Sequence, residues 1–79
     1  MKLSELPRFA SGIVRSVEPL AADDAIARRL ADLGFVPGET VRLIAHGPVG
    51  ADPLLVQVGF TRFALRRSEA ERVHLEVPA

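Results

Sequence analysis

A chain of 79 residues has room for one domain, so we expect residues 1–79 to form a single domain. The absence of cysteine excludes disulfides and thiolate metal sites. Apolar residues make up 48% of the chain, and 10 basic residues balance 10 acidic ones, which argues against disorder and against nucleic-acid binding.

The chain carries no signal for membrane insertion or export. No apolar run approaches the roughly 18–20 residues that a spanning helix needs. The N-terminus lacks the long apolar segment of a signal peptide, and Glu5 comes early. We therefore expect a cytoplasmic protein with no direct membrane insertion.

The first half of the chain predicts one strand and one amphipathic helix. Residues 12–18 form the strand, which Pro19 ends. Residues 21–33 form the helix, because three apolar side chains recur at helical spacing on one face: Ile26, Leu30 and Leu33.

The ends of this helix carry recognisable signals. Asp23 or Asp24 is expected to cap the N-terminus, and Asp24 is spaced to pair with Arg28 one turn later. Gly34 is expected to cap the C-terminus in the left-handed conformation, and Pro37 prevents continuation. A turn at residues 37–39 follows.

The second half predicts four short strands separated by breaker residues. Strands are expected at residues 40–45, 54–58, 63–65 and 72–77, with a loop at 46–53 and a hairpin tip at 59–62. The pattern of Ser68 followed by Glu71 predicts a capping box and one helical turn over 68–71. Val73, Leu75 and Val77 are expected to face inward.

Five short strands with one helix after the first strand indicate a mainly β protein. At this size we expect a small closed barrel, because closure leaves no exposed sheet edge.

No pattern in the chain is typical of an enzyme. Only two histidines are present, and no serine lies in a nucleophile elbow. Gly47-Pro48-Val49-Gly50 lacks the Lys-Ser/Thr ending of a phosphate loop, and Pro48 removes a backbone donor. We expect no catalysis and no required cofactor.

Two histidines are the candidate metal ligands. His74 and Glu76 project from one face of the last strand, and His46 follows another strand. These groups do not make a closed site, and solvated polar side chains are the commoner explanation. The alternative is weak binding of Zn²⁺ or Fe²⁺ at a site that a second molecule completes.

Basic and aromatic residues are the candidate partner contacts. Arg28 and Arg29 form a basic pair on the predicted helix, where a solvated face is the simpler interpretation. Phe60 lies near Arg62 at the hairpin tip, and the alternation leaves its burial or exposure open. An exposed aromatic beside an arginine suits a protein interface.

Four motifs occur in order along nearly the whole chain. They are Leu6-Pro7-x-x-x-x-Gly12, Leu30-x-x-Leu33-Gly34-Phe35-x-Pro37-Gly38-x-x-Val41, Gly47-Pro48-x-Gly50-x-Asp52-Pro53 and Gly59-x-x-x-x-Ala64-Leu65-Arg66-x-x-Glu69-Ala70-x-x-Val73. Together they resemble the FeoA family of ferrous iron transport proteins. Phe35 is a minor departure, because the family often carries Leu or Met there.

The resemblance implies a fold and a role. It implies one FeoA-type, SH3-like barrel with a helix inserted after the first strand. It implies a cytoplasmic accessory protein of ferrous iron uptake, which binds the cytosolic part of the FeoB transporter and reaches the inner membrane only through that partner. A homodimer is left open, and no catalytic or metal residue transfers from the family motifs.

A regulatory role is the alternative. A similar SH3-like domain ends the iron-dependent repressors, so a metal-responsive domain of that kind is a second hypothesis. Met1 precedes the domain directly, with no helix-turn-helix before it, which favours a stand-alone protein.

Overall fold

The computed structural model describes residues 1–50 and 52–76, and their strands form one antiparallel sheet. Along the chain the elements are η1 (Leu3–Glu5), β1 (Ser11–Val17), α1 (Ala25–Leu33), β2 (Thr40–Val49), β3 (Asp52–Val58), β4 (Thr61–Leu65), α2 (Arg67–Ala70) and β5 (Val73–Glu76). The strand order is β4-β3-β2-β1-β5. The expected mainly β fold, with five strands and a helix after the first, is confirmed. The expectations for Ala51 and Val77 lie outside the described residues.

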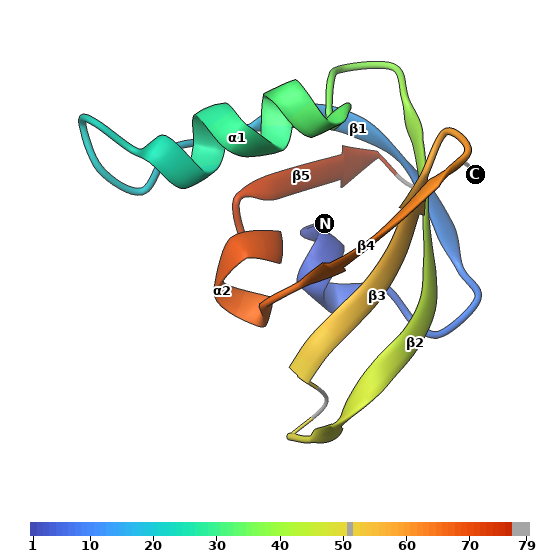
Figure 1. The fold of residues 1–79 in the computed structure, drawn as a ribbon. Coiled ribbons are helices and arrows are strands. Elements are labelled where there is room, and N and C mark those ends of the chain that lie inside the picture. The colour runs from blue at the N-terminus through green and yellow to red at the C-terminus, as the bar shows by residue number, and fades with distance from the viewer. Residues whose placement is uncertain (51, 77–79) are drawn as a thin grey trace.

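The sheet bends strongly, so that its two ends enclose the short helical segments (Figure 1). The 3₁₀ turn η1 lies against α2 and β5, and α2 also contacts β3. The N-terminus was not predicted to hold an element, yet Leu3 and Leu6 are both buried in the core. Lys2 forms a bridge with His74, so the N-terminus covers the outer edge of β5.

The core fills the space between the sheet, α1 and the two short helices. Its fully buried large side chains are Phe35, Leu3, Leu30, Leu43, Leu54, Val14, Val41, Val56 and Val73. Phe35 packs against Phe63 of β4, with ring centroids 6.0 Å apart and an interplanar angle of 49°. This contact ties the segment after α1 to the far end of the sheet.

Helix α1 begins four residues later than predicted, at Ala25. Asp24 is the N-cap, because its carboxylate accepts hydrogen bonds from the backbone N–H groups of Ile26 and Ala27. Gly34 ends the helix at φ 114°, which confirms the predicted left-handed cap. The predicted Asp24–Arg28 pair is wrong: the Arg28 guanidinium lies 2.5 Å from the Asp23 carboxylate, since the Asp24 carboxylate turns toward the helix end.

Strand β2 is longer than predicted, because the expected loop at 46–53 is largely strand. β2 and β3 pair from Val41↔Val58 to Val49↔Asp52, with irregularities after Leu43 and after His46. Local breakers did not end the strand because neighbouring backbone pairing continued it. Gly47 is required here, since a Cβ would overlap the backbone of Asp52.

The last elements follow the prediction with small shifts in their ends. β3 and β4 are joined by a two-residue turn at Gly59 and Phe60, so Thr61 and Arg62 belong to β4. The predicted capping box at Ser68 is wrong. Helix α2 begins one residue earlier, and the Glu69 carboxylate accepts a hydrogen bond from the Arg66 backbone N–H at 2.8 Å.

Candidate functional site

The predicted metal ligands lie on two separate strands. His46 is on β2 and His74 is on β5, and β1 lies between these strands in the sheet. The His74 Nε2 lies 3.3 Å from the Glu18 carboxylate, which follows β1. Glu18 was missed because His74 and Glu18 are far apart in sequence, and only the β1–β5 register brings them together.

These groups do not form a closed metal site within one chain. Among residues 1–50 and 52–76, no three His, Cys, Asp or Glu side chains converge as a metal site requires. A structural zinc ion takes four ligands, whereas His74 and Glu18 supply two. His74 and Glu18 therefore suit a shared site, in which further ligands come from elsewhere.

The two predicted basic contact residues on α1 are both exposed. Arg28 pairs with Asp23, and both side chains are well exposed to solvent. Arg29 also lies exposed on α1. An exposed pair of this kind contributes little to stability, so these side chains are available to a partner.

The β3–β4 hairpin presents the other two predicted contact residues. Phe60 is completely exposed. The sequence pattern had left open whether this side chain is buried or exposed. Arg62 donates from Nε to the Gln57 side-chain oxygen at 3.2 Å, and Gln57 in turn donates to the Gly59 carbonyl at 3.3 Å. These hydrogen bonds connect the Arg62 side chain to Gln57 on the neighbouring strand.

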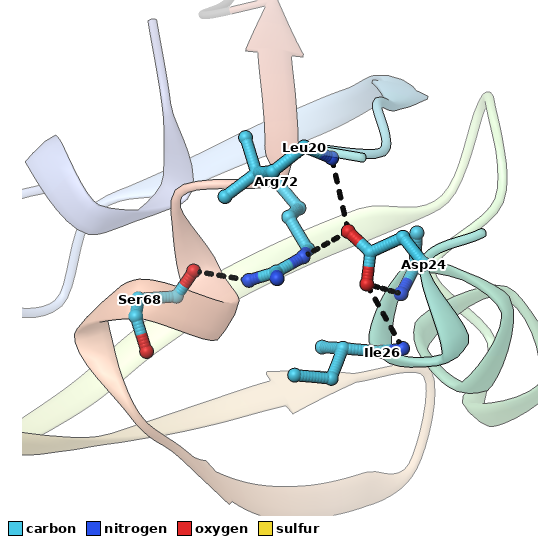
Figure 2. Close-up of polar contacts among 6 residues, drawn as sticks. Leu20, Asp24, Ile26, Ser68 and Arg72 are labelled. Atoms are coloured by element: carbon cyan, nitrogen blue, oxygen red, sulfur yellow. Dashed lines mark hydrogen bonds and ion pairs between the residues drawn. The ribbon is translucent and has the colours of Figure 1, made fainter. Parts of the chain in front are cut away.

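A buried ion pair fixes the position of α1. Asp24 accepts from the Leu20 backbone N–H at 2.9 Å and from the Arg72 Nε at 2.6 Å, as Figure 2 shows. Arg72 also donates to the Ser68 carbonyl at 2.7 Å. Both charged side chains are nearly enclosed, with 6% of Asp24 and 11% of Arg72 exposed. Arg72, which directly precedes β5, thus joins the start of α1 to α2.

The Asp24 carboxylate is held in its charged form. The hydrogen bond from Arg72, followed by that from the Leu20 N–H, lowers the pKa of Asp24 from 3.8 to about 2. Every contact of this carboxylate is internal to the fold, so we assign it a structural role.

Two open hollows mark the surface of the described residues. One, of about 320 Å³, lies beside α1 and is lined mainly by apolar residues: Val17, Pro19, Ala22, Asp24, Ala27, Arg28 and Ala31. The other, of about 310 Å³, lies over the sheet and is lined by Ser11, Gly38, Glu39, Thr40, Arg42, Gln57 and Gly59. None of the described helices has the length and apolar character needed to cross a bilayer.

Comparison with known proteins identifies the family of the chain. The FeoA domain family matches residues 1–77. The crystal structure of Stenotrophomonas maltophilia FeoA complexed with zinc, described as an SH3 domain protein and a candidate ferrous iron transport activating factor, is 67% identical over 96% of this chain and 89% of that one, with a TM-score of 0.90. The solution structure of a Chlorobium tepidum FeoA is 39% identical over 100% of this chain and 71% of that one, with a TM-score of 0.84.

A more distant likeness concerns the fold alone. The crystal structure of T. acidophilum IdeR is 18% identical over 99% of this chain and 34% of that one, with a TM-score of 0.76. No curated protein sequence matches the chain. The chain belongs to the FeoA family, with an SH3-like fold, and is a non-enzymatic accessory domain.

Proposed function

We propose that this FeoA-family chain is a cytosolic accessory protein of ferrous iron uptake and acts by binding the cytosolic part of a FeoB-type transporter. The observation that carries the proposal is the family match over residues 1–77. The 67% identical relative from Stenotrophomonas maltophilia, named as a candidate iron transport activating factor, supports it.

The described surface suits an interaction protein. The hollows beside α1 and over the sheet are both open, and the most exposed large apolar side chain is Phe60. Exposed aromatics and arginines are enriched among residues that dominate protein interfaces.

Two surfaces are proposed for contact with the transporter. One is on α1, with Arg28 and Arg29, and the other is on the β3–β4 hairpin, with Phe60 and Arg62. All four side chains are exposed, so neither surface requires the fold to open before binding.

A pull-down against the purified cytosolic part of the transporter tests the proposal. The experiment is run with and without a non-hydrolysable GTP analogue, since the nucleotide sets the conformation of a GTPase. We expect retention in at least one state. Absence of binding in both states, together with normal iron uptake after deletion of the gene, contradicts the proposal and favours the regulatory alternative.

A weak metal site is a second proposal, which the zinc complex of the Stenotrophomonas maltophilia relative favours. We propose that His74 or His46 binds Zn²⁺ or Fe²⁺ weakly, and that Glu18 or Glu76 supplies a carboxylate ligand. A second copy of the chain supplies the remaining ligands. Calorimetric titration with zinc is expected to show weaker binding in His74→Ala or His46→Ala. Unchanged affinity in both variants contradicts this site.

A further inference from the structure

The outward face of the sheet carries a polar row across β1, β2, β3 and β4, the four strands that lie side by side in Figure 1. The register pairs Ser11 with Arg42, Arg42 with Gln57, and Gln57 with Arg62, on β1, β2, β3 and β4. Their sequence neighbours Val41, Leu43, Val56 and Val58 are buried, so the row lies on the side opposite the core. Arg42 and Arg62 are exposed and Gln57 is half-buried.

An apolar row lies directly beside this polar row. On β3 and β4, Leu55 pairs with Ala64, one step along from Gln57 and Arg62 on the same face. Ala45 on β2 pairs with Leu55, and both residues are only partly covered. Two guanidinium groups therefore border a strip of half-exposed apolar side chains, which is the composition of an interface.

Phe9 lies beside Arg42 of the polar row, in a strained conformation. Its φ is 67°, in the left-handed region that side chains other than glycine seldom adopt, and its side chain is 55% exposed. Its N–H donates to the Leu43 carbonyl at 2.7 Å, and the Arg42 Nε donates to its carbonyl at 3.4 Å. The Arg8 and Arg42 guanidinium carbons lie 4.7 and 5.7 Å from the ring centroid. The fold thus holds a partly exposed aromatic ring in contact with two arginines.

The positive charge of this face is not neutralised within the described chain. Arg8, Arg42 and Arg62 take part in none of the ion pairs among residues 1–50 and 52–76. Glu39, which lines the hollow over this face, is the one carboxylate among the hollow's lining residues. Arg8, Arg42 and Arg62 outnumber this single carboxylate, so the face carries a local excess of positive charge.

We infer that this face, defined by Phe9, Arg42, Gln57 and Arg62, is the docking surface for an acidic segment of the partner protein. Arg42 and Arg62 lie two strands apart, roughly 10 Å from the strand spacing, so the segment presents two separated carboxylates. Guanidinium groups bind carboxylates in bidentate geometry, and the adjoining apolar strip accepts an apolar side chain. This inference rests on the proposed function and selects the sheet over α1 as the principal contact surface.

Calorimetric titration of the transporter's cytosolic part with two matched variants tests the inference. Arg42→Glu/Arg62→Glu reverses the charge of the face, and Lys2→Glu/Arg66→Glu makes the same change in net charge at two exposed residues outside the proposed contact surfaces. We expect the first variant to raise Kd at least about tenfold and the second to change it less than about threefold. Binding of the wild type is expected to weaken with salt.

The other outcomes of the titration contradict either the proposed function or the inferred docking surface. If the wild type does not bind, the proposed function fails and the inference fails with it. If the wild type binds and both variants bind equally well, only the inference fails. Arg62→Glu alone, with circular dichroism as a check of folding, covers the case in which the double variant does not fold. Tighter binding of a mixed-sequence single-stranded oligonucleotide than of the transporter domain also overturns the inference.

Discussion

Removing the Phe35 side chain is expected to destabilise the protein severely. Phe35 is fully buried and packs against Phe63. Truncation of a buried phenylalanine to alanine costs about 3–5 kcal/mol. Stabilities of about 0.05–0.15 kcal/mol per residue give about 4–12 kcal/mol for a chain of this length. Phe35→Ala therefore removes between a quarter and all of the stability.

Phe35→Leu is the matched control, because leucine keeps most of the apolar volume. We expect it to cost less than about 1.5 kcal/mol, including the loss of the tilted ring contact with Phe63. For a domain of this size each 1 kcal/mol shifts Tm by about 4–8 °C. Phe35→Ala is then expected to melt about 12–40 °C lower than the wild type.

Urea titration followed by far-ultraviolet circular dichroism measures both variants, since the chain has no Trp or Tyr for fluorescence. The wild type is expected to unfold in one cooperative transition. An unchanged urea midpoint for Phe35→Ala would refute the reasoning, because it would show that the segment after α1 is not packed in the core.

Three further predictions follow from the fold. Gly47→Ala is expected to destabilise by about 1–3 kcal/mol, measured by urea titration, because its Cβ overlaps the Asp52 backbone; equal stability would contradict the β2–β3 geometry. The depressed pKa of Asp24 means that its stabilising effect is present above about pH 4 and lost as pH falls toward about 2. Asp24→Asn is expected to melt with a weaker pH dependence in that window, and an identical profile would argue against the Arg72 contact. Phe60→Ser is expected to leave stability within about 0.5 kcal/mol while weakening transporter binding, whereas a large loss of stability would show that the ring is not exposed.

Local sequence signals predicted the elements but not all of their ends. The apolar spacing of α1 and the Gly34 cap were read correctly, because both depend on residues a few positions apart. The helix start was predicted too early, since the Arg72 partner that holds Asp24 lies 48 residues away. Strand β2 was predicted too short because Pro48 and Gly47 are local breakers, whereas the strand is extended by its pairing with β3.

The candidate surfaces were harder to predict than the elements, because they are built from contacts between residues that are distant in sequence. Phe60 and Arg62 were identified from the hairpin signal, but Arg42 and Gln57 joined them only through cross-strand register. The left-handed φ of Phe9 gave no sequence signal, and its N–H pairs with the carbonyl of Leu43, which is distant in sequence. The pairing of His74 with Glu18 likewise follows from the β1–β5 register.

Uptake of labelled Fe²⁺ in cells that lack the gene tests the central claim most directly. We expect uptake to fall without the gene, and to be restored by the wild type and by Lys2→Glu/Arg66→Glu but not by a folded Arg42→Glu/Arg62→Glu variant. Normal uptake in cells without the gene would contradict a role in ferrous iron transport.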